Sequence, residues 1–281
     1  MKFEYQRPAT LEAALKFLAA AGGDCAPLAG GTDLLVMIQE GLVGPRTVLD
    51  ISRLEELKNI REEDGRIEIG ALVSHGRAAA AKLLREKAAL LVESCLQIGS
   101  PQIRASGTIG GNLVMASPSG DTIPALYALG AGVVLKSVTG TRTVAIEDFF
   151  TGVKKSVRRP DELLTAIVFP APEPSARGFY NKLGQRKALA IAKVSVAALV
   201  TRKGEKVEKV RIALGAVAPT VIRAPRTEEY LAGRKLDPET IAAARSLCAG
   251  ESRAITDLRS TAGYRDRMAG LLLARGLEDL L

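Results

Sequence analysis

The chain of 281 residues has few cysteines and histidines, the side chains that most often hold zinc ions and iron–sulfur clusters. Its three cysteines, Cys25, Cys95 and Cys248, are far apart and form no C-x-x-C pair, so they do not predict a zinc or iron–sulfur site. The only histidine, His75, excludes a multi-histidine metal site within one chain. We therefore predict no metal site in this chain, and we expect the cysteines to be buried free thiols in a reducing cytoplasm.

Aromatic residues are scarce as well, at 4% of the chain, and this bears on its positive charge. The net charge of +8 comes from 39 Lys and Arg against 31 Asp and Glu. Only Lys154-Lys155 and Arg158-Arg159 form a tight basic cluster, and no aromatic residues are interleaved with them. Nucleic-acid binding is therefore not predicted. A solvated surface, or a docking face for an acidic partner, accounts for the charge.

Long apolar runs are also missing. No stretch approaches the roughly 18 residues of a membrane span. The first eight residues, MKFEYQRP, contain no continuous apolar segment of the kind found in secretory signals. We predict a cytoplasmic protein without a membrane span.

The length and one proline-rich segment indicate two domains. A chain of 281 residues is long for one hydrophobic core. The prolines of Pro170–Ser175 exclude a helix and stiffen the connection. We place the domains at residues 1–175 and 176–281. In the second, strands are followed by helices, which predicts an α+β domain with helices on one face of a sheet.

Hydrophobic periodicity gives a coarse assignment of elements. Helix Thr10–Ala21 has Thr10 as its N-cap. Other helices are expected at 34–39, at 78–98 as one or two helices with a break near Lys87, and at 121–129, 237–249 and 259–281. Strands are expected at 26–29, 47–51, 66–71, 133–135, 143–146, 162–169, 179–183, 192–201 and 209–217.

Two glycine-rich segments are the most informative features. The first is Leu28–Leu34, LAGGTDL, and the second is Ser106–Asn112, SGTIGGN, which continues to Asp121 through ASPSGD. Glycine-rich turns can direct several main-chain N–H groups at one anion. Two such turns suit the two phosphates of a dinucleotide. The alternative is that each Gly-Gly pair is only a turn, since neither matches a dinucleotide fingerprint or a phosphate loop.

Together with Tyr180–Leu183 and Arg186–Val194 (RKALAIAKV), these segments resemble a known family over essentially the whole chain. The family comprises the FAD-binding subunits of molybdenum hydroxylases, such as the medium subunit of carbon monoxide dehydrogenases and the FAD subunit of xanthine dehydrogenases. The resemblance implies an α+β fold: a two-part, vanillyl-alcohol-oxidase-like FAD-binding domain followed by a smaller α+β domain. Some relatives carry an extra iron–sulfur cluster on a cysteine-rich insertion, which this chain lacks.

The resemblance also implies non-covalent FAD and a set of binding residues. The first segment would wrap the pyrophosphate and the second would support the pyrophosphate and ribitol, with the isoalloxazine between the domains. Leu164 resembles the family's apolar residue near the flavin ring, and Lys182 a basic residue at the cofactor. The implied cofactor-binding residues are Ala29, Gly30, Gly31, Thr32, Asp33, Leu34, Thr108, Gly110, Gly111, Asn112, Ser117, Asp121, Leu164 and Lys182.

Several of these residues allow a second interpretation. Asp33 and Asp121 carry the wrong sign for phosphate contact, so each would accept hydrogen bonds from ribose or ribityl hydroxyls or cap local N–H groups. Lys182 would stabilise an anionic reduced flavin, or be a solvated strand residue. Leu164 could be an ordinary core residue. His75 could tether FAD covalently, although a helix-start or packing role is the simpler interpretation.

The predicted function is that of an electron-transfer flavoprotein subunit without catalytic side chains. The resemblance implies a molybdopterin-binding large subunit, a small subunit with [2Fe-2S] clusters, electron transfer to NAD or another acceptor, and a dimer of heterotrimers. Two alternatives remain. A stand-alone flavin oxidoreductase would turn over a small organic substrate by itself, and a non-enzymatic scaffold that has kept the fold would hold no flavin.

Overall fold

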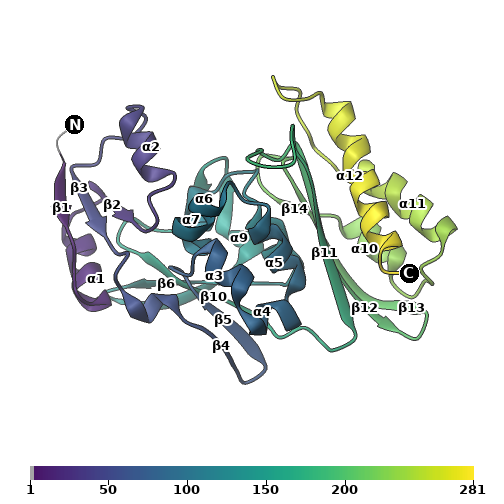
Figure 1. The fold of residues 1–281 in the computed structure, drawn as a ribbon, viewed down its shortest axis with the longest axis horizontal. Coiled ribbons are helices and arrows are strands. Elements are labelled where there is room, and N and C mark those ends of the chain that lie inside the picture. The colour runs from purple at the N-terminus through teal and green to yellow at the C-terminus, as the bar shows by residue number, and fades with distance from the viewer. Residues whose placement is uncertain (1–2) are drawn as a thin grey trace.

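A computed structural model describes residues 3–281 (Figure 1). The chain first forms a small parallel sheet of order β1-β3-β2, with helices α1 and α2 beside it. These elements are β1 (Glu4–Gln6), α1 (Leu11–Ala20), β2 (Cys25–Leu28), α2 (Leu34–Gln39) and β3 (Thr47–Asp50). Thr10 caps α1 as predicted, because its hydroxyl accepts the Ala13 N–H at 3.2 Å.

A five-stranded antiparallel sheet of order β4-β5-β10-β6-β7 forms the middle of the molecule, with a group of short helices packed against it (Figure 1). The strands are β4 (Ile60–Glu63), β5 (Arg66–Gly70), β6 (Gly132–Ser137), β7 (Gly140–Ala145) and β10 (Leu163–Pro170). Smaller elements are the 3₁₀ helix Glu55–Lys58, α9 (Ile146–Phe149), β8 (Phe150–Gly152) and β9 (Lys155–Ser156).

The prediction of one or two helices over residues 78–98 is wrong, because the chain forms more helices there. The structure has three, α3 (His75–Ala80), α4 (Lys82–Lys87) and α5 (Ala89–Leu96). The break near Lys87 is present, at Ala88, but a second break lies at Ala81, whose backbone is extended (φ −67°, ψ 121°). Alanine is a strong helix former, so nothing in the local sequence marks that break.

The third part is an antiparallel sheet of order β11-β12-β13-β14 covered on its outer face by three helices (Figure 1). Its strands are β11 (Ala176–Leu183), β12 (Val194–Lys203), β13 (Lys206–Gly215) and β14 (Ile222–Arg223). Its helices are α10 (Pro225–Leu231), α11 (Pro238–Ala249) and α12 (Ala262–Glu278). This arrangement confirms the predicted sheet covered by helices, although α12 begins at 262 rather than 259.

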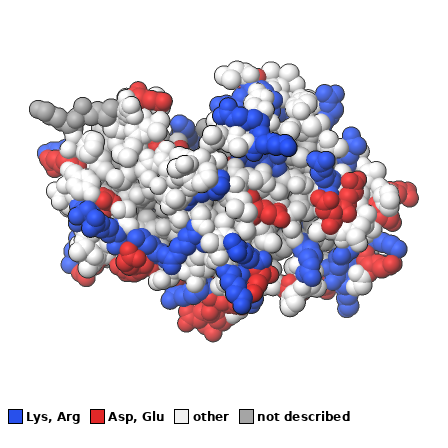
Figure 2. Space-filling model, in the orientation of Figure 1, with Lys and Arg blue, Asp and Glu red and all other residues white. Residues whose placement is uncertain are grey.

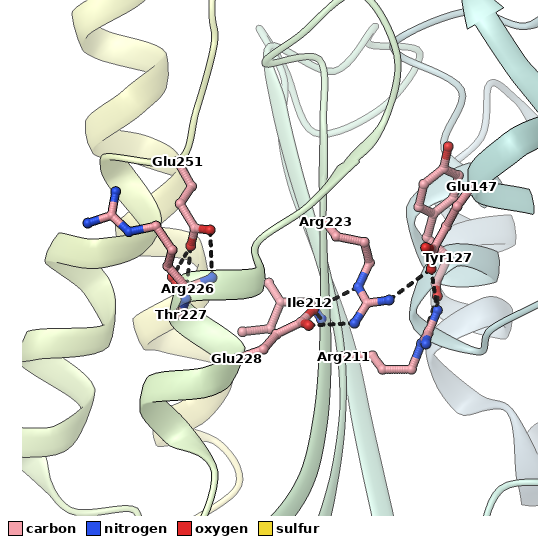
Figure 3. Close-up of polar contacts among 9 residues, drawn as sticks. All are labelled: Tyr127, Glu147, Arg211, Ile212, Arg223, Arg226, Thr227, Glu228 and Glu251. Atoms are coloured by element: carbon pink, nitrogen blue, oxygen red, sulfur yellow. Dashed lines mark hydrogen bonds and ion pairs between the residues drawn. The ribbon is translucent and has the colours of Figure 1, made fainter.

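Helix α10 was not predicted, because its N-terminal cap comes from far along the chain. The Glu251 carboxylate accepts the N–H groups of Arg226 and Thr227 at 2.8 and 2.9 Å (Figure 3). The Thr227 hydroxyl donates to the same carboxylate at 2.5 Å. A carboxylate at a helix N-terminus satisfies free N–H groups and suits the helix dipole.

The inner face of the third part packs on helices of the middle part, and we call this contact the seam. Helix α5 contacts β11, and α8 (Thr122–Ala128) contacts β12 and β13. Polar contacts cross the same seam, since Arg211 of β13 and Arg223 of β14 both donate to the Glu147 carboxylate of α9, at 2.5 and 2.8 Å (Figure 3). The middle core extends across the seam to Tyr180, Ala197 and Ala213.

Candidate functional site

A cavity of about 740 Å³ lies where the two glycine-rich segments meet. This volume is within the usual range for small-molecule and cofactor sites. All but one of the residues implied by the resemblance line it. They are Ala29, Gly30, Gly31, Thr32, Asp33, Leu34, Thr108, Gly110, Gly111, Asn112, Ser117, Asp121 and Leu164.

The first glycine-rich segment runs from the end of β2 to the start of α2. A Cβ atom on Gly30 would lie 1.9 Å from the carbonyl oxygen of Ser106, so the two glycine-rich segments can touch only with glycine there. Gly31 has φ +73°, a conformation that disfavours other residues. The glycines therefore bring the two cavity walls together in addition to exposing backbone toward the cavity.

The second segment is mostly helical rather than a loop. It begins at Ser106, the last residue of α6 (Pro101–Ser106), and passes through Gly107-Thr108 into α7 (Ile109–Met115). The Thr108 hydroxyl caps α7 by accepting the Gly111 N–H at 3.0 Å. A Cβ atom on Gly110 would lie 2.7 Å from the carbonyl oxygen of Ala71, so glycine permits close packing there. Prediction of a glycine loop missed these helices because glycine is a poor helix former.

The capping alternative for Asp33 and Asp121 is wrong, because neither side chain makes a capping hydrogen bond. Asp33 lies at the start of α2, and burial raises the pKa of its carboxyl group while nearby Lys154 opposes this. Asp121 lies just before α8 and lines the cavity. The Asp33 carboxylate thus remains available for hydroxyl groups in the cavity, whereas each Asp121 oxygen has one partner in the third part and can accept one further hydrogen bond.

Asp121 is bound from behind by the third part of the molecule. Tyr180 Oη donates to its Oδ1 at 2.7 Å, and Lys182 Nζ lies 2.8 Å from its Oδ2. Lys182 Nζ also donates to the carbonyl oxygen of Gln97 at 3.1 Å. Burial raises the pKa of the Asp121 carboxyl, and the positive charge of Lys182 opposes that shift.

This pairing corrects one interpretation of Lys182. Its side chain is only 6% exposed, so it is not a solvated strand residue. It is also the one implied residue that is not among those lining the cavity. Lys182 instead stands directly behind Asp121, so any effect on the cavity passes through that carboxylate. Direct contact with a cofactor stays a prediction.

Leu164 and His75 both belong to the cavity wall. Leu164 lies in β10 opposite Leu135 and is buried. His75 is the first residue of α3, after the N-cap Ser74, which confirms the helix-start role. Its ring is buried, and Nδ1 is 4.0 Å from Cys95 Sγ. Burial lowers the pKa of His75 to about 4, so the ring is neutral at pH 7.

The structure adds cavity residues that the sequence did not indicate. Arg158 is one, and its guanidinium is held by donating to the carbonyl oxygens of Arg159 and Glu162 at 3.0 and 2.7 Å. Its basic cluster was visible in the sequence, but not its place in the wall. Leu189–Ile191, on the loop between β11 and β12, also reach the cavity. That loop lies within a segment that carries the family resemblance.

Other kinds of site were searched for over residues 3–281. Every helix in this range is either too short or too polar to traverse a bilayer. The same range contains no group of three or more His, Cys, Asp or Glu residues arranged to hold a metal ion.

Two family models match the chain in succession. Residues 1–172 match the FAD binding domain in molybdopterin dehydrogenase, and residues 179–280 match the CO dehydrogenase flavoprotein C-terminal domain. Together they cover both parts of the predicted organisation, while the boundary at 175/176 stays a prediction.

Curated relatives and solved structures resemble the chain over nearly its full length. It is 35% identical to the carbon monoxide dehydrogenase medium chain of Afipia carboxidovorans, covering 98% of this chain and 96% of that one. It is 36% identical to the nicotinate dehydrogenase FAD-subunit of Eubacterium barkeri, covering 86% and 83%. A carbon monoxide dehydrogenase structure from Hydrogenophaga pseudoflava superposes with a TM-score of 0.95 at 32% identity, covering 99% and 96%.

Proposed function

The chain belongs to the FAD-binding medium subunits of the molybdenum hydroxylases, and we propose that it relays electrons between partners of such an enzyme. As a flavoprotein component of an oxidoreductase, it would take electrons from the [2Fe-2S] clusters of a small subunit. It would pass them to NAD or another acceptor in the cytoplasm. A molybdopterin-binding large subunit would oxidise the substrate, in a dimer of heterotrimers.

The cavity fits non-covalent FAD. Its two glycine-rich walls are pressed together, so main-chain groups from both can face one elongated ligand. Main-chain donors suit a pyrophosphate because they are already fixed by the fold. Two carboxylates, of Asp33 and Asp121, and the Asn112 amide offer partners for ribose or ribityl hydroxyls. The His75 ring is buried at the start of α3, and its Nδ1 lies 4.0 Å from Cys95 Sγ, which favours packing over covalent attachment.

Each part of the wall would have its own task. Residues 29–34 and 108–112 would hold the pyrophosphate, and Leu164 would lie against the ring system. Asp121 would orient a hydroxyl, kept in place by Tyr180 and Lys182. Bound FAD would supply the redox chemistry, while the protein binds, orients and excludes water. No side chain needs to act as a nucleophile or general acid.

The observation that carries this proposal is the meeting of both glycine-rich segments at one cavity. It is tested by the visible absorption spectrum of the purified chain before and after acid precipitation. We expect a flavin band that moves to the supernatant and is identified there as FAD. A yellow pellet would mean covalent attachment and return His75 to consideration. A colourless protein that takes up no added FAD would contradict the proposal and favour a scaffold.

The stand-alone oxidoreductase is distinguished by turnover. The FAD-loaded chain alone should not oxidise small organic substrates in the presence of an acceptor dye. Reduction of the dye by the isolated chain with such a substrate would support the alternative.

A further inference from the structure

Two coils of the third part expose apolar side chains to solvent. One is the loop 184–193 between β11 and β12, whose Leu189 and Ile191 are 53% and 54% exposed. The other is the coil 251–261 ahead of α12, in which Leu258 is 93% exposed and Ile255 is 65% exposed. Exposed apolar groups gathered in one place mark interaction sites more often than isolated ones do.

The two coils are neighbours. Lys193, at the end of the loop 184–193, places its Nζ 6.0 Å from the centre of the Tyr264 ring, in the first turn of α12. Both coils therefore lie at the same end of the third part (Figure 1). We call the exposed residues of 184–193 and 251–261 the rim patch.

The rim patch is tied to the cavity at two points. Leu189–Ile191 line the cavity themselves. The coil 251–261 is held by Arg265, which pairs with Asp257 at 2.6 Å and donates to the carbonyl oxygen of Ala216 at 3.1 Å. The Ala216 N–H in turn donates to the carbonyl oxygen of Pro118 at 2.9 Å, between the cavity residues Ser117 and Ser119. A protein docked on the rim patch would lie next to the cavity.

The charge of the rim patch is of one sign. Arg186, Lys187, Arg253 and Arg259 are exposed, and none forms an ion pair within residues 3–281. Figure 2 shows basic side chains gathered on this upper part of the molecule. The Arg186 guanidinium also donates to the carbonyl oxygens of Ala188 and Leu189, at 3.0 and 2.7 Å, and so steadies the loop.

We propose that the rim patch is the docking surface for the small [2Fe-2S] subunit, and that this partner presents an acidic face around an apolar recess. The proposal rests on the proposed function, because it assumes that such a partner delivers electrons to the cavity. Protein interfaces combine a desolvated apolar centre with arginines around it, which matches Leu258 and Ile255 between the exposed basic residues. Unpaired cations would steer an acidic partner and speed its association.

A nucleotide would fit the same surface less well. Basic side chains could meet the phosphates of NAD, but a leucine that is 93% exposed offers nothing to a charged dinucleotide. Burial of Leu258 in a recess of a protein partner would remove its apolar surface from water, which is favourable.

The test measures binding of the FAD-loaded chain to the purified small [2Fe-2S] subunit of the same complex. Leu258→Asp should weaken binding at least tenfold, because it puts a charge at the centre of the interface. The double variant Arg253→Glu/Arg259→Glu should weaken binding by a similar factor and reduce its dependence on salt. Matched controls away from the rim patch are Val138→Asp, in the β6–β7 turn, and Lys203→Glu, at the end of β12, and they should bind as the wild type does.

The readouts separate this proposal from the proposed function. All variants should keep the flavin spectrum of the wild type, since none of the substituted residues lines the cavity. If the wild-type chain holds no FAD, the proposed function fails. If it holds FAD and the rim-patch variants bind the small subunit as tightly as the wild type, only the docking surface is wrong. Loss of NAD binding with unchanged subunit binding would likewise overturn it, in favour of a nucleotide site.

Discussion

At the scale of single residues, His75 gives the chain a specific pH dependence. It is the only histidine, its ring is buried, and burial lowers its pKa from 6.5 to about 4. Between these values the unfolded chain binds a proton that the folded chain does not. The free energy of unfolding therefore falls as the pH drops from 6.5 toward 4, by about 2 kcal/mol between pH 7.5 and 5.

This is measured by urea unfolding of the wild type and of His75→Gln at both pH values. Carboxylates contribute to both proteins, so the quantity to compare is the difference between their pH dependences. We expect the variant to lose less stability on acidification. Equal losses in the two proteins would mean that His75 is protonated in the folded state as readily as in the unfolded one.

Asp121 and Lys182 form a buried ion pair, so the effect on stability of removing one charge should depend on whether the other charge is present. Their side chains are 12% and 6% exposed. Lys182→Met removes the cation and leaves a buried carboxylate, which should cost about 3 kcal/mol of unfolding free energy. The double variant Asp121→Asn/Lys182→Met removes both charges and should recover most of that loss. Urea unfolding at pH 7.5 measures both, and a double variant no more stable than Lys182→Met would refute the pairing as the cause.

At the scale of elements, the glycine-rich segments act through their contact with each other. Gly30→Ala would place a methyl carbon 1.9 Å from the Ser106 carbonyl oxygen, so the cavity walls must separate. We expect a loss of about 2 kcal/mol in stability and FAD binding weakened more than tenfold. Gly44→Ala is the matched control, because an added Cβ there meets nothing within 4 Å. FAD titration followed by flavin fluorescence measures both variants, and similar affinities would contradict the prediction.

Some of these helices and strands can be predicted from local sequence, and others cannot. Helix α1 and the strands β6 and β7 were predictable, because Thr10 caps α1 locally and only Val138 and Thr139 separate the two paired strands. Helix α10 was not, because its cap, Glu251, is 24 residues beyond Thr227. Helix α7 was hidden because its first turn holds two glycines, which serve packing against Ala71 and capping by Thr108.

The residues of the candidate site also divide into those that local sequence predicts and those that it does not. Residues in the two glycine-rich segments could be found from the sequence, because one short motif carries each group. Arg158 and Leu189–Ile191 could not, since they reach the cavity from segments that are far away in sequence. Lys182 was found, but its place behind Asp121 depends on how the third part packs against α8. That packing is a property of the whole chain.

At the scale of the whole molecule, one seam joins the third part to the middle, and ion pairs fasten it. Near the cavity, Tyr180 and Lys182 hold Asp121; elsewhere along the seam, Glu147 accepts from Arg211 and Arg223 (Figure 3). Arg223 is also held by Glu228 at 2.5 Å, and Arg211 donates to the carbonyl oxygen of Tyr127 at 3.1 Å. Arg223 is thus anchored within the third part by Glu228, whereas both contacts of Arg211 cross the seam, and the two guanidinium groups share the Glu147 carboxylate.

Glu147→Gln should loosen this seam, because it leaves two neighbouring guanidinium groups without their shared anion. The Glu147 side chain is 41% exposed, so solvent screening limits the loss of unfolding free energy to about 1 kcal/mol. Because the lost term is electrostatic, the difference from the wild type should shrink in 0.5 M salt. Glu173→Gln is the control, since it breaks the exposed Lys209–Glu173 pair, which joins β13 to the proline-rich connection, and it should cost less. Equal losses for the two variants, unchanged by salt, would mean that the Glu147 pairs add nothing to the seam and that apolar packing alone holds the two parts together.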